Sequence, residues 1–241
     1  MIYAMSDLHG CYDKFIGMLD KIHFSEKDTL YILGDVVDRG EDGIKLLLDL
    51  AKRKNVICLR GNHDNTALRI LNYLKTPADS PLADKLIEIF KLWLSDGGYP
   101  TYKAFSALDE PGRQTVLSYL NSLPIFDEIT VADRSFFLSH TGPQNEKMQN
   151  FDSCQMNDFL IGEIEYEKVY FKDKFFVSGH TPTELIDKSY KGRIYQKNNH
   201  IAIDCGAVFG NPLGCICLNT LEKFYFDDME KCCRLSNSTT L

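Results

Sequence analysis

Short apolar runs recur along the chain. Each is four to six residues long and is closed by glycine or serine. A run of this length is typical of a strand rather than a helix, and the closing residues indicate loops. Between the early runs, residues 15–22 and 44–51 place apolar side chains at helical spacing. Strands that alternate with helices in this way predict βαβ units and an α/β fold.

Polar side chains of the kind that bind metal ions follow each of these runs. The six groups are Asp7 with His9, Asp35 with Asp38, Asn62 with His63 and Asp64, then His140, His180 and Asp204. In open α/β sheets, ligands bind beyond the carboxyl ends of the strands. We therefore expect these groups to gather at one rim of the fold, where chemistry can take place.

Residues 66–122 follow a helical pattern instead. Three apolar faces are predicted: Leu68, Leu71 and Leu74; Leu86, Phe90 and Trp93; and, after a start at Pro111, Val116, Leu117 and Leu120. We interpret residues 66–122 as a helical insertion within a single domain of residues 1–241. After His180 we expect a loop or hairpin, then strands at 201–204 and about 213–219, and a polar tail at about 228–241 that frays.

Composition narrows the class of protein. A chain of 241 residues fits one large domain. It has no C-x-x-C pair, no signal-peptide pattern and no apolar run long enough to span a membrane, so a cytoplasmic protein with reduced thiols is expected. The net charge of −7 opposes binding to nucleic acid. An anionic substrate would need local positive charge, from metal ions or arginines, and we expect neither a nucleic-acid nor a membrane partner.

The polar groups predict a metal centre. Four of the six histidines belong to them, which is hard to attribute to chance. Carboxylate, amide and imidazole donors suit manganese, iron or zinc, and the absence of cysteine from these groups argues against a structural zinc site. Six ligands exceed what one open metal needs and fit two metals about 3.5–4 Å apart that share a carboxylate. The simpler alternatives are a helix cap at Asp7 and His9, and a left-handed turn at Asn62.

Five stretches carry a family resemblance. DLHG, GDVVDRG, RGNHD, SHTG and GHTP follow one another between residue 5 and about residue 210. Together they resemble the calcineurin-like metallophosphoesterase superfamily. The arginines and the stretch IDCGAVFG resemble its phosphoprotein phosphatase branch, in particular bacterial and phage-lambda type serine/threonine phosphatases and the related symmetrical diadenosine tetraphosphatases. The resemblance implies two mixed β-sheets packed face to face and flanked by helices.

The resemblance also implies roles for the polar groups. Two divalent ions are expected, with manganese serving in vitro and iron or zinc as the alternatives. The implied metal ligands are Asp7, His9, Asp35, Asn62, His140 and His180, with Asp35 bridging the two ions. A hydroxide between the ions would attack phosphorus.

The remaining implied roles concern the substrate. His63 would protonate the leaving group and Asp38 would orient the His63 ring. Arg39, Arg60 and Asn62 would hold phosphate oxygens. For Arg60, pairing with Asp64 or Asp204 is the alternative. Asp64 fits a helix start or an arginine partner, and we favour a structural role for Asp204.

The resemblance is compatible with two classes of substrate. We expect a phosphatase for phosphoserine and phosphothreonine in proteins, and the alternative is a hydrolase of dinucleoside polyphosphates. A cluster of cations after His180 would suit the second class, although a solvated hairpin explains it equally well: Lys188, Lys191, Arg193 and Lys197. Lambda-type enzymes carry a further arginine between the last two histidine motifs, whereas the stretch QMNDFLIGEIEYEKVYF has no arginine there and offers Lys168 as its one cation. Pro182, in place of another histidine, argues against a nuclease, and the complete ligand set argues against a pseudoenzyme.

Overall fold

Two five-stranded mixed sheets form the centre of the molecule, in a computed structural model that describes residues 1–74 and 83–227, of which 83–85 are described as backbone only. The predicted tail at 228–241 lies outside the described residues. The first sheet has the order β10-β9-β1-β2-β3. Its strands are β1 (Ile2–Met5), β2 (Thr29–Ile32), β3 (Val56–Cys58), β9 (Leu213–Cys217) and β10 (Lys223–Phe226). The predicted two-sheet fold is confirmed.

The second sheet has the order β4-β5-β6-β8-β7. Its strands are β4 (Phe126–Val131), β5 (Arg134–Ser139), β6 (Lys174–Ser178), β7 (Tyr195–Lys197) and β8 (His200–Ala202). In each sheet three neighbouring strands run parallel, β1-β2-β3 in the first and β5-β6-β8 in the second. Because parallel neighbours end at the same edge, the residues that follow β1, β2, β5 and β6 are brought to one rim.

Alternation along the strands decides which side chains fill which layer. In β2, Leu30 and Ile32 face the helices, whereas Tyr31 packs between the sheets. In β5, Leu138 packs between the sheets and Phe137 faces outward into a separate aromatic cluster. The strand period of two residues explains this division. Burial of both faces accounts for the nearly continuous apolar runs of these strands.

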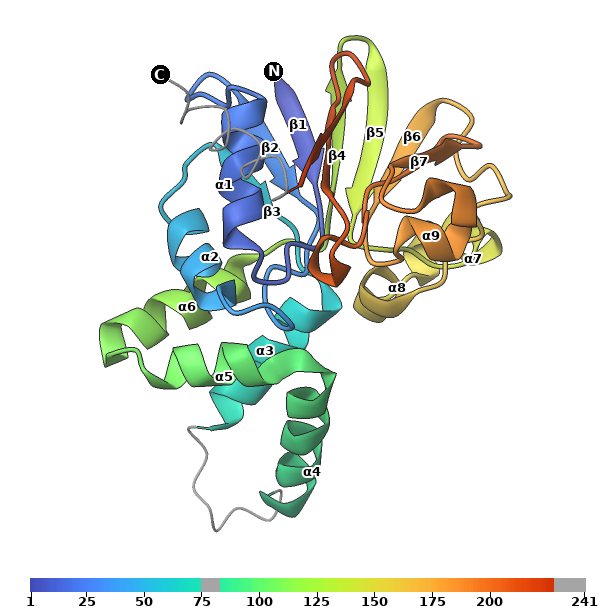
Figure 1. Ribbon diagram of the computed structural model, residues 1–241. Coiled ribbons are helices and arrows are strands. Elements are labelled where there is room, and N and C mark those ends of the chain that lie inside the picture. The colour runs from blue at the N-terminus through green and yellow to red at the C-terminus, as the bar shows by residue number, and fades with distance from the viewer. Residues whose placement is uncertain (75–82, 228–241) are drawn as a thin grey trace, which may run out of the picture.

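Helices cover both outer faces (Figure 1). On the first sheet lie α1 (Tyr12–Lys21), α2 (Gly43–Leu50), α3 (Asn62–Tyr73) and α6 (Glu110–Ser122). The second sheet is accompanied by α7 (Asn145–Gln149), α8 (Met156–Ile161) and α9 (Thr183–Ile186). Short helical turns are η2 (Phe151–Ser153), η3 (Lys188–Tyr190) and η4 (Ala207–Phe209). The segment predicted as a loop or hairpin after His180 holds α9 and η3 and ends in the β7–β8 hairpin, turned by Asn198 and Asn199 at positive φ.

Two helices of the 66–122 region lie beyond the strand ends. α4 (Ala83–Trp93) and α5 (Tyr99–Ser106) meet at a kink, η1 (Leu94–Gly98), and Figure 1 shows both helices beyond one end of the first sheet. The kink has an identifiable cause, since Gly97 has a φ of 98° that leaves the helical region. The predicted start of α6 is accurate, with Pro111 in its first turn. The kink therefore directs residues 93–101 toward the rim that carries the polar groups.

Candidate active site

Six polar residues at the strand ends adopt left-handed backbone conformations. Positive φ angles occur at Asp7, His9, Asp35, Asp38, Arg39 and His180. Such angles are uncommon outside glycine, although Asp and His are enriched among the exceptions. They cluster at functional sites because the backbone must turn sharply there to aim side chains at one point. Close approach also demands glycine at 61, where a Cβ would lie 2.1 Å from Asp35 Oδ1.

The Asp35 carboxylate lies at the centre of the rim. Its Oδ2 is 3.6 Å from His9 Nε2 and 3.5 Å from His140 Nε2, and all three side chains are buried. Its Oδ1 accepts a hydrogen bond of 3.0 Å from the backbone N–H of His63. Two groups of potential ligand atoms share this carboxylate, and within each group the atoms lie within 4.8 Å of one another: His9, Asp35 and His63, and Asp35, His140 and His180.

Asn62 joins the second of these groups. Its Oδ1 lies 2.9 Å from His140 Nε2 and 3.0 Å from His180 Nδ1, and the two ring nitrogens are 3.1 Å apart. Asn62 begins α3, directly after β3, so the turn into that helix aims its amide at the rim. One amide oxygen and two imidazole nitrogens thus converge beside Asp35.

The histidine rings are held in the form that binds metals. Nδ1 of His9 lies 2.8 Å from the carbonyl oxygen of Val37, and Nδ1 of His140 lies 2.8 Å from that of Leu33. Donation from Nδ1 leaves the Nε2 lone pair directed at Asp35. Burial lowers the pKa of His9 to about 4, and burial together with His140 lowers the pKa of His180 to about 4. Both rings are therefore neutral at pH 7.

Asp7 adds a further buried carboxylate beside these groups without belonging to either of them. Its Oδ2 accepts hydrogen bonds from the His180 backbone N–H, at 3.0 Å, and from the Ser6 hydroxyl. Burial, then repulsion from Asp204 and Asp35, raises the pKa of Asp7 well above its ordinary value. Burial and repulsion from Asp35 likewise raise the pKa of Asp204 to about 7. Divalent cations would neutralise this concentration of acid, and the donor set fits them.

Asp38, His63 and Trp93 form a connected group at the edge of the site. His63 Nδ1 lies 2.9 Å from Asp38 Oδ2, and the Trp93 indole N–H donates to the same oxygen at 2.8 Å. Burial opposes protonation of His63, but the hydrogen bond to Asp38 and the charge of Asp35 outweigh it and raise the His63 pKa. His63 therefore differs from His9, His140 and His180, whose pKa values are lowered.

The helical kink holds the loop that carries Asp38 and Arg39. The backbone N–H of Asp38 donates to the Thr101 hydroxyl at 3.0 Å, and that of Arg39 donates to the Gly97 carbonyl at 2.7 Å. With Trp93, three contacts thus join the helical region to this loop. The sequence assigns Trp93 to an apolar helix face and gives Gly97 and Thr101 no role, because these residues meet the loop only in the folded chain.

Arg39 faces the histidines. Its Nη1 lies 2.5 Å from His9 Nε2, and its Nη2 lies 2.9 Å from His63 Nε2. The structure directs Arg60 elsewhere, because its Nη2 donates to the carbonyl oxygens of Leu120 and Asn121 at the end of α6, at 3.2 and 2.9 Å. Arg60 thus anchors α6, and the structure does not bring it together with the other predicted phosphate-binding residues.

The remaining acidic positions have structural partners. Asp64 accepts from the backbone N–H groups of Asp35, Val36 and Gly61 at 2.8–3.0 Å, which caps α3 and fixes the loop after β2. Of its two anticipated roles, the helix start is the one the contacts match. Asp204 Oδ1 accepts from the Gly206 N–H at 2.8 Å.

Two of the four cations in the predicted basic cluster pair with carboxylates. Lys191 lies 3.2 Å from Glu184, and Lys197 lies 3.2 Å from Asp187. The Arg193 guanidinium lies 4.5 Å from the centre of the Tyr225 ring. Lys168 lies 2.6 Å from Glu165. These contacts favour the solvated-hairpin interpretation over a phosphate-binding surface.

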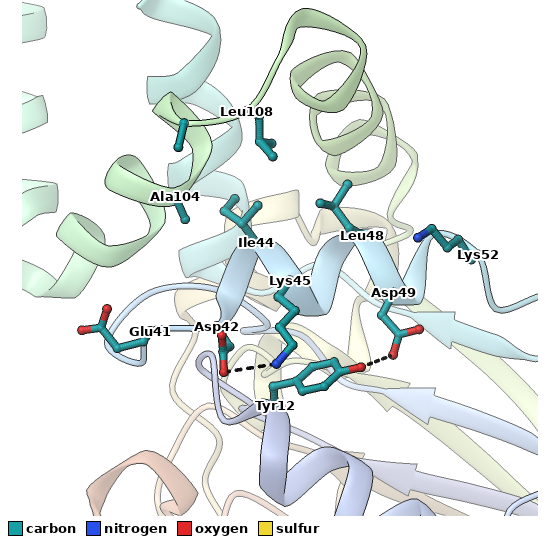
Figure 2. A pocket seen from close by; sticks show the side chains of 11 residues that line it. Tyr12, Glu41, Asp42, Ile44, Lys45, Leu48, Asp49, Lys52, Ala104 and Leu108 are labelled. Carbon is teal, nitrogen blue, oxygen red and sulfur yellow. Dashed lines mark hydrogen bonds and ion pairs between the residues drawn. The ribbon is translucent and has the colours of Figure 1, made fainter.

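A separate cavity of about 600 Å³ is lined by residues of α2, by Tyr12 of α1 and by residues at the end of α5 and just after it. Figure 2 shows its apolar wall of Ile44, Leu48 and Leu108, with Lys45 beside Tyr12. Lys45 Nζ is 3.7 Å from Asp42 Oδ2 and 3.9 Å from the centre of the Tyr12 ring. None of the predicted site residues lines this cavity, and two of its charged groups, Lys45 and Asp42, pair with each other.

The sequence matches a known protein family over most of its length. The model of the calcineurin-like phosphoesterase family matches residues 1–209. The chain therefore belongs to the calcineurin-like phosphoesterase family, and it is a hydrolase of the metallophosphoesterase type. This confirms the resemblance carried by the five motifs.

Two relatives of this chain are named as enzymes that act on dinucleoside tetraphosphates. The asymmetrical bis(5'-nucleosyl)-tetraphosphatase PrpE of Bacillus velezensis is 26% identical over 234 residues, covering 87% of this chain and 85% of the relative. The symmetrical bis(5'-nucleosyl)-tetraphosphatase of Wigglesworthia glossinidia brevipalpis is 38% identical over 89 residues, which cover 36% of this chain and 32% of the relative. The second similarity thus concerns about a third of each protein.

Solved structures support the fold. A candidate diadenosine tetraphosphatase has a TM-score of 0.66 at 17% identity, covering 93% of this chain and 92% of the other. A protein serine/threonine phosphatase of Saccharomyces cerevisiae has a TM-score of 0.55 at 15% identity, covering 94% and 79%. At such identities the likeness concerns the fold alone. Within the described residues, no helix is long and apolar enough to cross a membrane.

Replacing Trp93 with Phe should weaken the hold on Asp38. The variant loses the N–H donor to a buried carboxylate, so we expect the free energy of unfolding to fall by about 1–3 kcal/mol. Turnover by the metal-loaded enzyme should fall by about tenfold, because Asp38 keeps its contact with His63 but is itself held less firmly. Urea denaturation and steady-state hydrolysis measure the two effects.

Phe90→Leu is the matched control, since Phe90 packs 6.2 Å from the Trp93 ring without reaching Asp38. It should lose stability and keep turnover. Full turnover in Trp93→Phe would contradict a role for the indole in positioning Asp38.

Proposed function

We propose that this chain hydrolyses dinucleoside polyphosphates with the help of two divalent metal ions. The observation that carries the proposal is the position of Asp35 Oδ2, 3.6 Å from His9 Nε2 and 3.5 Å from His140 Nε2, between two groups of donors. A carboxylate shared in this way is the arrangement that a two-metal site requires. The names of the relatives supply the substrate class, because the one covering 87% of this chain is a bis(5'-nucleosyl)-tetraphosphatase.

The residues that would hold the ions combine members of the two groups with Asp7 and Asn62, which lie beside them, as the family resemblance implies. Asp7, His9 and Asp35 would hold the first ion; Asp35, Asn62, His140 and His180 would hold the second. Bound divalent ions would supply Lewis-acid activation of water and charge neutralisation at phosphate oxygens. We expect manganese to serve in vitro, and iron or zinc fits the same donors.

Two side chains would act directly on the substrate. His63, oriented by the 2.9 Å contact with Asp38, would donate the proton at Nε2 to the departing oxygen. Its raised pKa favours the protonated form that such a role needs. Arg39 would bind phosphate oxygens through the two guanidinium nitrogens that now face His9 and His63.

The phosphoprotein substrate favoured by the motifs alone is the weaker candidate. Its support was the resemblance to a phosphatase branch that uses several arginines around one phosphoryl group. Here the Arg60 guanidinium contacts the end of α6, and Lys168 pairs with Glu165. A polyphosphate chain spreads its charge over several groups, so it depends less on a complete arginine cluster at a single phosphorus.

A substrate comparison tests the proposal. The manganese-loaded protein is assayed on diadenosine tetraphosphate, on a phosphoserine peptide and on bis(p-nitrophenyl) phosphate. We expect the highest kcat/KM on the dinucleotide, with ATP and AMP as products if cleavage follows the asymmetrical relative. A higher kcat/KM on the peptide would reject the proposal in favour of a protein phosphatase.

The Asp35→Asn variant tests the shared carboxylate. Because one oxygen and one charge would be lost from both donor groups, we expect both ions to be lost after dialysis, against about two ions per chain in the wild type. Elemental analysis measures the metal content, and circular dichroism checks the fold. Asp20→Asn, which removes an exposed carboxylate from α1, is the control. Retention of two ions by Asp35→Asn would refute the bridge.

The His63→Asn variant tests the proton donor. Alkoxide leaving groups need a proton, so hydrolysis of a phosphoserine peptide should fall by about 10²–10⁴-fold. Nitrophenolate leaves readily as an anion, so p-nitrophenyl phosphate should lose much less. The measurement is the ratio of the two kcat values. Equal losses on both substrates would show that His63 does not act as the acid.

A further inference from the structure

The loop after β8 presents an exposed aromatic ring. Phe209 ends η4 with 60% of its surface exposed, whereas Ala207 in the same turn is buried. Gly206 and Gly210 flank the turn at φ angles of 77° and 86°, which let the chain reverse tightly on both sides. The ring belongs to the stretch IDCGAVFG, to which the proposed reaction gives no role.

A buried lysine fixes this loop in place. Lys14 extends from α1 with 7% of its surface exposed, and its ammonium donates to the carbonyl oxygens of Ala207 and Asn211 at 2.9 and 2.8 Å. Lysine is rarely buried unless its charge has partners. The two bonds span η4 from one end to the other. Phe209 is therefore exposed on a loop that is anchored to α1.

The ring lies beside the candidate active site. The Arg39 guanidinium carbon is 5.5 Å from the centre of the Phe209 ring, within the range of a cation–π contact. The same guanidinium contacts His9 Nε2 and His63 Nε2. Arg39 thus connects an open aromatic ring to the donors around Asp35, and a ligand held by Arg39 would pass next to the ring.

We propose that Phe209 is a stacking platform for a nucleobase, and that it forms with Arg39 a subsite for one nucleotide unit of the substrate. The inference rests on the proposed function and specifies how that substrate is recognised. Arg39 takes a phosphate group, and the base of the same nucleotide stacks on the exposed part of the ring. Stacking accepts any base, because each has a π-face. The subsite is therefore selective for nucleotides over base-free phosphates and tolerant among the bases.

The Phe209→Ala variant tests the platform with and without a base on the ligand. We expect the KM for diadenosine tetraphosphate to rise by about tenfold, the size of one lost stacking contact, with inorganic tripolyphosphate changed by less than about twofold. Phe209→Tyr keeps the ring and should behave as the wild type. Ile87→Ala, which removes another exposed apolar side chain from α4, is the control for general surface effects.

Binding measurements test this subsite independently of the proposed hydrolysis. Calorimetry on the manganese-loaded protein compares ADP with inorganic pyrophosphate, and ADP affinity should fall by about tenfold in Phe209→Ala while pyrophosphate affinity stays constant. If the wild type binds ADP in this ring-dependent way but leaves diadenosine tetraphosphate intact, the subsite stands and the reaction has been wrongly assigned. Equal changes for ADP and pyrophosphate, or none for either, would overturn the subsite.

Discussion

The Asp35 carboxylate is the interaction on which the rest of the site depends. One of its oxygens faces two histidine rings, and the other accepts the N–H of His63. The same residue therefore connects the donor groups from both sheets and fixes the start of α3. Burial and the charge of Asp35 raise the pKa values of the neighbouring Asp7 and Asp204, and divalent cations would relieve this concentration of buried negative charge.

Backbone strain is the structural consequence of this convergence. Side chains that leave separate strands must turn toward one point, and six of them do so through positive φ angles. The surrounding sheets hold them there, since both faces of the parallel strands are covered by packed apolar layers. The packed apolar layers thus stabilise the strained backbone conformations that the site requires.

The helical region beyond the strand ends takes part in the site. Trp93, Gly97 and Thr101 each contact the loop of Asp38 and Arg39, which carries the proposed acid partner and phosphate ligand. The kink at η1 makes this possible by turning the chain toward the rim. Variation in this region would therefore alter the orientation of His63 as well as the shape of the approach to the site.

The sequence by itself determined the strands, the helices that join them and the polar groups at the strand ends. These are local properties, set by the period of apolar residues and by the residues that close each run, and the five motifs identified the family for the same reason. Only the tertiary structure decided how distant residues use their polar atoms. Trp93 meets Asp38 across 55 positions and Lys14 meets Ala207 across 193, while Arg60 contacts the end of α6. Such contacts depend on packing between elements, and no pattern within a short window of sequence records them.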